Sequence, residues 1–142
     1  MTTNDQALRA LLGERELGVL ATLKRDGRPQ LSTVTHHFDA ANDTILVSVT
    51  DGRAKTRNLR RDPRASYHVA SEDGWSYAVA EGTAELSEVA RDPHDAAVEE
   101  LIDLFRRVQG EHPDWDEYRA AMVADKRVVL RLRVARVYGM AR

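Results

Sequence analysis

Short runs in which apolar and polar residues alternate dominate the first half of the chain and predict strands joined by turns. Four runs have the length and β-branched content of strands: 18–23, 30–38, 44–49 and 65–70. Asp26-Gly27 stands between the first two, in the position that such pairs favour in hairpins. Because short turns join the first three strands, we expect them to form an antiparallel meander.

Two longer strands are predicted in the second half. In segment 75–86, Gly82 is expected to mark a bulge or a close approach of two backbones. Segment 127–139 alternates apolar residues with arginine over part of its length, which predicts a half-buried strand carrying Arg131 and Arg133 on its outer face, with Arg136 as a further candidate.

Helical spacing predicts helices around these strands. The first runs to about Leu12, is capped by Asn4 or Thr3 and stops at Gly13. Another opens at Asp92-Pro93 and closes at Gly110, and a third covers 115–124. About six strands with a helical excursion before the last predict a mainly β, single domain over 1–142: a small antiparallel barrel with peripheral helices.

The segment from Arg53 to Arg64 is the candidate functional element. Six of its twelve residues are basic and one is acidic, although the chain carries a formal net charge of −2. We predict a short helix ending near Pro63, set between two strands. The free N–H groups at its start, next to Lys55 and Arg57, suit a phosphate or carboxylate. Arg25, in the turn 24–29, is expected to lie away from this site.

Two other interpretations of the basic segment remain open. A charged helix face is commonly only solvated, in which case Arg60, Arg61 and Arg64 do nothing more. A basic helix is also the electrostatic footprint of nucleic-acid binding. The acidic net charge and the lack of a second basic stretch argue against a nucleic-acid partner.

The remaining composition excludes several chemistries. The chain has no cysteine, so disulfides and thiolate sites within it are excluded. His36 and His37, as strand neighbours, should face opposite ways, and no metal site is predicted. Hydrolase, Rossmann and Walker motifs are absent, so any demanding chemistry would come from a cofactor. No membrane span or signal peptide is expected, which agrees with a cytoplasmic location.

Four segments together resemble the pyridoxamine 5'-phosphate oxidase-like split β-barrel family, in particular its actinobacterial branch that uses the deazaflavin coenzyme F420. They are Gly18 to Leu23, Asp26 to Ser32, Arg53 to Leu59 and Asp62 to Ser66. Gly74 to Gly82 and the region from Tyr118-Arg119 to Arg127-Val128 extend the similarity over nearly the whole chain.

The resemblance implies a six-stranded, FMN-binding-like split barrel and a homodimer with the cofactor in a groove at the subunit interface. It implies that Lys55 holds the cofactor phosphate, beside Arg53 and Thr56. It places further cofactor-binding residues on the strands and along the helix: Gln30, Ser32, Thr33, Thr35, Ser48, Asn58, Leu59, Arg60 and Arg61. Trp75, Ser76 and Tyr77 would approach from a facing strand, and the strand of the partner subunit is one alternative.

Charge favours coenzyme F420 over FMN, because the phosphodiester and oligoglutamate tail of F420 suit several basic residues along one groove. The expected activity is hydride transfer to a conjugated acceptor such as a biliverdin-like tetrapyrrole, a quinone or an enone, with the protein positioning the reactants. No catalytic residue is assigned, although Lys55, Arg57 and Tyr77 are candidates for stabilising charge on the acceptor. An FMN enzyme resembling pyridoxamine phosphate oxidase and a non-enzymatic cofactor carrier remain alternatives.

Overall fold

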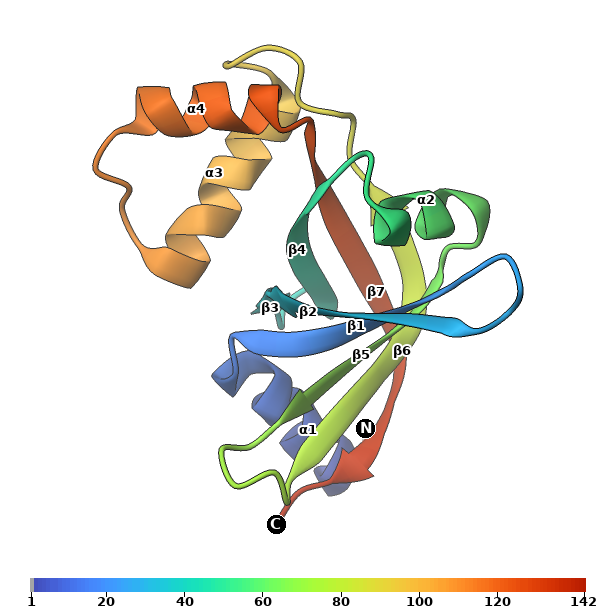
Figure 1. The fold of residues 1–142 in the computed structure, drawn as a ribbon. Helices are drawn as coiled ribbons and strands as arrows, with labels where there is room; N and C mark the ends of the chain where they lie inside the picture. The colour runs from blue at the N-terminus through green and yellow to red at the C-terminus, as the bar shows by residue number, and fades with distance from the viewer. Residues whose placement is uncertain (1) are drawn as a thin grey trace.

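The computed structural model describes residues 2–142, which form one curled antiparallel sheet and four helices (Figure 1). In chain order the elements are α1 (Thr3–Glu14), β1 (Leu17–Leu23), β2 (Pro29–Thr35), β3 (His37–Asp39), β4 (Thr44–Thr50), α2 (Ala54–Arg61), β5 (Arg64–Ala70), β6 (Tyr77–Leu86), α3 (Ala96–Gln109), α4 (Trp115–Ala124) and β7 (Arg127–Met140). None of the helices in residues 2–142 has the length and apolarity to cross a membrane.

The mainly β, split-barrel class predicted from the sequence is confirmed, with seven strands in place of six. The order across the sheet is β2-β1-β5-β6-β7-β4-β3. The predicted strand 30–38 is divided at His36: β2 pairs with β1 at one edge, whereas β3 pairs with β4 at the other. The expected meander is therefore wrong in detail. The first part of the predicted middle strand, β2, pairs with β1, and its last part, β3, pairs with β4 at the opposite edge of the sheet. This crossing from edge to edge requires the sheet to curl (Figure 1).

The break at His36 has a physical cause in the core. The imidazole Nε2 lies 2.8 Å from the Leu12 carbonyl oxygen, and Nδ1 lies 2.6 Å from the Tyr67 hydroxyl. A neutral ring that carries its proton on Nε2 donates to the first and accepts from the second. His36 is fully buried while His37 is half-buried, in agreement with the prediction that neighbouring side chains diverge.

Acid should weaken the fold through His36. Burial lowers the pKa of His36 below its usual 6.5. As pH falls below 6.5 the unfolded chain takes up a proton that the folded chain refuses, so the free energy of unfolding should fall by up to about 1.4 kcal/mol per pH unit. Urea titrations from pH 7.5 to 5 should show this slope for the wild type and for His94→Gln, which changes an exposed histidine. The same slope in His36→Gln would contradict the assignment.

α1 covers one end of the barrel with Leu8, Leu11 and Leu12, which join the main hydrophobic core (Figure 1). Its N-cap is Thr2, whose hydroxyl accepts from the Asp5 N–H at 3.0 Å in a capping box. The predictions of a cap at Asn4 or Thr3 and a stop at Gly13 are therefore wrong. The helix continues through Gly13 to Glu14, since a glycine within a helix costs only about 1 kcal/mol and the core contacts outweigh it.

The β6–β7 pair is the longest in the sheet and confirms two predictions. The register shifts between Glu81 and Gly82, and a Cβ on Gly82 would lie 1.8 Å from the Arg133 carbonyl oxygen. Arg131, Arg133 and Arg136 of β7 face outward and form ion pairs: Arg131 with Glu85 of β6 and Glu100 of α3, Arg133 with Glu85, and Arg136 with Glu81. The alternating pattern thus indicated the solvent face correctly.

α3 and α4 form a hairpin that stands beside β4, away from the barrel axis (Figure 1). A second hydrophobic cluster joins the hairpin to the sheet, with Val98, Leu101 and Met122 packed around Val129 of β7. The predicted start of the first of these helices is wrong, because Asp95 and not Asp92 is the N-cap of α3. The Asp95 carboxylate accepts from Val98 N–H and also from the N–H groups of Arg91 and Asp92, a set that Asp92 cannot reach.

Removing this cap should destabilise the protein measurably. Asp95→Ala is expected to lower the free energy of unfolding by about 1–2 kcal/mol, because it leaves three backbone N–H groups without their acceptor. Asp92→Ala, which removes only a bond to the His94 N–H, is the matched control and should cost about half as much or less. Denaturant unfolding measures both. Equal losses in the two variants would mean that the helix begins where the sequence suggested.

Candidate functional site

α2 is held by its own uncharged side chains. The chain leaves β4, turns at Asp51-Gly52 and enters the helix through Arg53, the N-cap residue. The Thr56 hydroxyl is buried and donates to the Thr50 carbonyl at 2.7 Å, and Leu59 is packed in the barrel core. Thr56 and Leu59, both predicted to bind cofactor, therefore anchor the helix to the barrel in this chain.

Three of the basic side chains already have partners. Arg60 forms an ion pair with Asp51, and Arg64 forms one with Asp62 at 2.8 Å. Arg61 donates to the Leu23 carbonyl at 2.7 Å and to Asn58 Oδ1 at 3.2 Å, tying α2 to the β1–β2 hairpin. The solvated-face interpretation fits Arg64, which is largely exposed. Arg60 and Arg61 instead contribute to how the helix is seated.

Lys55 and Arg53 are cations without a counter-charge at the start of α2. Neither forms an ion pair with any acid in residues 2–142. Lys55 is half-buried, and its pKa is lowered first by desolvation and then by the positive charges of Arg53 and Arg127. Three cations thus share one local field beside free helix N–H groups. An anion bound there would relieve their repulsion.

Arg127 was not predicted from the sequence as a site residue. It begins β7, seventy-nine positions after Ser48, and its Nη1 lies 3.5 Å from both the carbonyl and the hydroxyl oxygen of Ser48. In the sequence it is one more arginine of an alternating strand. The only signal that included it was the family-like segment ending at Arg127-Val128, because the β4–β7 pairing that brings it to this place is a tertiary feature.

A basic hollow of about 490 Å³ lies on the other side of the first turns of α2. It is lined by Arg57 and Arg61 of the helix and by Lys24 and Arg25 of the β1–β2 hairpin, with one acid, Asp26. Arg25 therefore faces the basic helix, and the expectation that it lies away from the site is wrong. Local sequence did not indicate this, since the hairpin is brought to α2 by tertiary contacts, among them the bond from Arg61 to the Leu23 carbonyl.

Asn58 and Gln30 meet beneath the basic hollow. Asn58 is buried, and its amide nitrogen donates to Gln30 Oε1 and to the Thr22 hydroxyl, both at 3.1 Å. These bonds hold α2 against β1 and β2. The predicted neighbourhood of Gln30 and Asn58 is found, although in this chain the two side chains satisfy each other.

The strand residues predicted to lie near the cofactor ring separate onto two faces of β2. Gln30 and Ser32 point inward. The hydroxyl oxygen of Ser32 is buried and has no hydrogen-bond partner among the described residues. Thr33 and Thr35 point outward. A single pocket within one chain thus includes at most one of these pairs.

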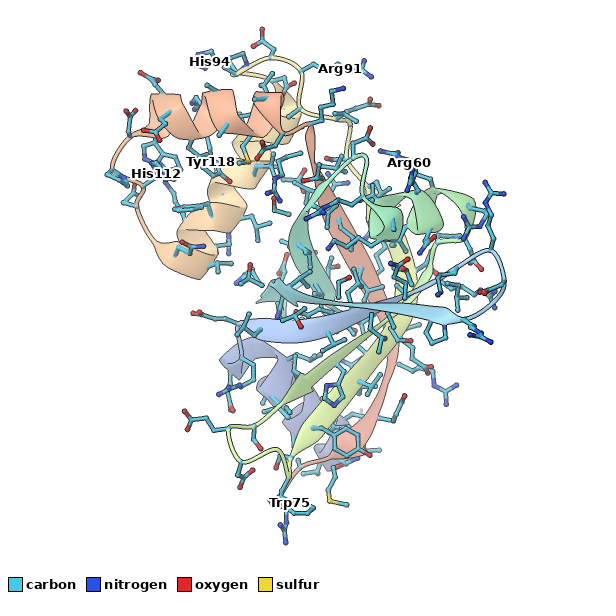
Figure 2. The ribbon with its side chains drawn as sticks, in the orientation of Figure 1. Arg60, Trp75, Arg91, His94, His112 and Tyr118 are labelled. Carbon is cyan, nitrogen blue, oxygen red and sulfur yellow. The ribbon has the colours of Figure 1, made fainter. Side chains whose placement is uncertain are left out.

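Thr35 and Ser48 come together in a hollow of about 220 Å³ between the outer face of the barrel and the α3–α4 hairpin. Arg127 and Gln109 are its other polar lining residues. The rest of the lining is apolar or aromatic: Leu104, Phe105, Val108, Tyr118 and Met122. Tyr118 lies between α4 and α3 (Figure 2) and donates its hydroxyl to the Leu101 carbonyl at 3.1 Å; burial raises its pKa to about 12. The hydroxyl is therefore occupied, and the ring serves as a wall.

Trp75, Ser76 and Tyr77 are not brought to the basic helix within this chain. Trp75 lies at the end of the molecule away from α2 and Arg60 (Figure 2). It is 65% exposed, with the Arg142 guanidinium 5.9 Å from its ring centroid, while Tyr77 stacks on His68. Ser76 and Trp75 belong to the turn before β6, because Ser71 and Asp73 bind their N–H groups.

The arrangement suits a ligand that has both anionic and planar parts. Cations without counter-charges surround the start of α2 on two sides, and an apolar hollow with two hydroxyl groups lies next to Arg127. Within the described part of the chain, no group of three histidine or acidic side chains is placed to hold a metal ion. The described side chains supply binding and orientation, and a redox step would require a bound cofactor.

Comparison with known proteins agrees with this fold. A solved structure called an F420 reductase is 25% identical, with 92% of this chain and 94% of that chain covered and a TM-score of 0.68. The conserved hypothetical protein Rv2991 from Mycobacterium tuberculosis is 24% identical over 98% of this chain and 84% of its own, with a TM-score of 0.72. A heme binding protein from Mycobacterium smegmatis is 23% identical over 99% of this chain and 55% of its own, with a TM-score of 0.70.

The pyridoxamine 5'-phosphate oxidase family profile matches residues 5–141 and so includes all the strands and helices from β1 to α4. Its span takes in the basic helix, the hollow beside Arg127 and all of β7. With the sequence profile and the split-barrel structure in agreement, this chain belongs to the pyridoxamine 5'-phosphate oxidase family.

Proposed function

We propose that this protein is an oxidoreductase that binds coenzyme F420 and delivers its hydride to a conjugated small-molecule acceptor. The observation that carries the proposal is Lys55, a half-buried cation with a lowered pKa and no acidic partner among residues 2–142, at the start of a helix. Such a group is stabilised by an anion, and phosphate is the anion that a helix N-terminus accommodates best. The F420 reductase at 25% identity supports the choice of cofactor.

The distribution of positive charge favours F420 over FMN. Lys55 and Arg53 lie on one side of the first turn of α2, while Arg57, Arg25 and Lys24 line the hollow on the other side. The single phosphate of FMN would occupy only one of these two basic regions. A phosphodiester followed by several glutamates extends across both, so the otherwise unexplained basic hollow gains a role as the site for the tail.

The chain's own residues would position the cofactor rather than react with it. Bound F420 supplies a hydride from its reduced ring, and a proton from solvent completes the reduction of the acceptor. Lys55 and Arg53 hold the anionic end, while Thr35 and Ser48 offer hydroxyl groups beside the hollow. The α3–α4 hairpin shields that hollow from water on one side, which keeps the reacting groups close and dry.

A homodimer is part of the proposal. Five large apolar side chains are about half exposed or more: Leu17, Leu31, Trp75, Tyr138 and Met140. Leu17 and Leu31 belong to the β1–β2 hairpin, and the other three gather where β6 and β7 meet. Burial in a subunit interface would remove them from water, and would allow Trp75 and Tyr77 of a second chain to reach the cofactor. Light scattering after gel filtration should give twice the 16.0 kDa chain mass.

The decisive experiment is a parallel titration of one dimer preparation with F420 and FMN, followed by fluorescence. Tight F420 binding with weak FMN binding is expected, and the reverse would overturn the proposal in favour of an FMN enzyme. Arg57→Ala should weaken the binding of F420 that carries its glutamate tail, and should leave the binding of the tailless form unchanged. Arg136→Ala, which removes an arginine that pairs with Glu81 and lines neither hollow, is the control for charge.

Turnover separates an enzyme from a carrier. Reduced F420 mixed with protein and a quinone or an enone should be oxidised faster than in buffer, which is followed by the returning absorbance of the oxidised ring. Biliverdin tests a tetrapyrrole acceptor in the same assay. Tight binding without acceleration on any of these acceptors would instead indicate a cofactor carrier.

A further inference from the structure

The hollow beneath the α3–α4 hairpin contains one cation in an otherwise neutral lining. Of the described residues that surround it, none is acidic, and five are apolar or aromatic. Arg127 stands at its edge beside Ser48. A planar molecule with one negative end matches such a lining, because its body would contact the apolar wall and its charge would meet the guanidinium.

The guanidinium of Arg127 has unused hydrogen-bonding capacity. Arg127 forms a loose ion pair with Asp125, whose Oδ2 lies 3.7 Å from its Nε. This distance is too long for a hydrogen bond, so the buried Nε has no hydrogen-bond partner in residues 2–142. Its Nη1 contacts Ser48 at 3.5 Å, the outer limit for a hydrogen bond. An arginine presents five donors in a planar fork that fits a carboxylate with two parallel bonds. Arg127 is thus poorly satisfied by the protein itself.

The size of the hollow limits what enters it. About 220 Å³ is less than the roughly 300–1,000 Å³ of sites for drug-sized molecules. One or two fused rings fit such a space, whereas a complete tetrapyrrole does not. The ring of Phe105 and that of Tyr118 lie 4.9 Å apart, and they form a preorganised aromatic wall on the helical side.

We propose that this hollow binds a one- or two-ring acceptor that carries a carboxylate, with Arg127 gripping the carboxylate and Phe105 and Tyr118 contacting the ring. That the bound molecule is a hydride acceptor rests on the proposed reductase function. The inference names the substrate class of that site, which is a carboxylated quinone or enone. Thr35 and Ser48 line one side of the same hollow, so the ring of the acceptor would lie next to the strand residues assigned to the cofactor.

Binding of 2-naphthoate and its neutral isostere 2-naphthamide to the cofactor-free protein tests the inference by calorimetry. The wild type should bind the carboxylate at least tenfold more tightly than the amide. Arg127→Gln should remove this preference, Arg127→Lys should restore part of it, and Arg136→Gln on the outer face of the same strand should keep it. Val108→Phe, which fills the hollow without altering its charge, should weaken the binding of both ligands.

Three results would overturn the inference: no binding of naphthoate by the wild type, equal binding of the two ligands, or an unchanged preference in Arg127→Gln. The test is independent of F420. Failure of F420 binding with a persistent carboxylate preference would overturn the reductase and support the carboxylate site. F420 turnover without that preference would overturn only the inference about the hollow.

Discussion

Replacing Gly82 with alanine should lower the free energy of unfolding by about 3 kcal/mol, the upper end of what overpacking costs. A Cβ at this position would lie 1.8 Å from the Arg133 carbonyl oxygen and 2.8 Å from its carbonyl carbon. Both are backbone atoms of β7, so no rotamer change can make room and the two strands must separate. Since a domain of this kind is stable by only about 5–15 kcal/mol, much of the folded population is at risk.

Gly52→Ala is the matched control, because nothing lies within 4 Å of a Cβ built at that glycine. It should change the free energy of unfolding by no more than about 0.5–1 kcal/mol, in either direction. Urea denaturation measures both variants against the wild type. A Gly82→Ala protein as stable as the control would mean that the β6–β7 bulge lies elsewhere.

Lys55→Ala should weaken F420 binding by about 1.5–3 kcal/mol, which is roughly a 10- to 150-fold rise in Kd, because a charged hydrogen bond is lost. Folding should not suffer, since the lysine has no acidic partner among the described residues and its desolvated charge is unfavourable in the free protein. Fluorescence titration gives the affinity and thermal unfolding gives the stability. Arg64→Ala, which removes an exposed arginine paired with Asp62, should bind as the wild type does. Normal affinity in Lys55→Ala would rule out the anchor at the basic helix.

The affinity should also depend on pH in a direction that Lys55 sets. The protonated amine binds the anion, and the pKa of Lys55 in the free protein is below its usual value of 10.5. Raising the pH through that lowered pKa therefore removes the charge and weakens binding at a pH where an ordinary lysine is still protonated. Lys55→Arg should bind at high pH without this loss, because arginine stays charged. A flat profile in the wild type would show that Lys55 does not hold the anion.

The local sequence was sufficient to predict the helices and strands that depend mainly on neighbouring residues. Alternation identified the strands and the outward arginines of β7, and Gly82 marked the bulge where two backbones meet. The helix at Trp115–Ala124 was predicted with its observed bounds, and the basic helix α2 ends at Arg61, two residues before its predicted end near Pro63. Helix starts were less certain, because several aspartates compete as caps, and Asp95 prevails over Asp92 by reaching three N–H groups at once.

Alternation and turn residues along the chain were sufficient to predict a mainly β barrel with one basic helix, and the resemblance of its motifs pointed to the pyridoxamine 5'-phosphate oxidase family, which the family profile confirms. The tertiary structure decided which cations are available. It paired Arg60 with Asp51, turned Arg25 toward α2, and brought Arg127 from β7 to Ser48 and the field of Lys55. The contact of Arg127 with Ser48 joins residues seventy-nine positions apart, and it exists only once the sheet has curled and β4 has paired with β7.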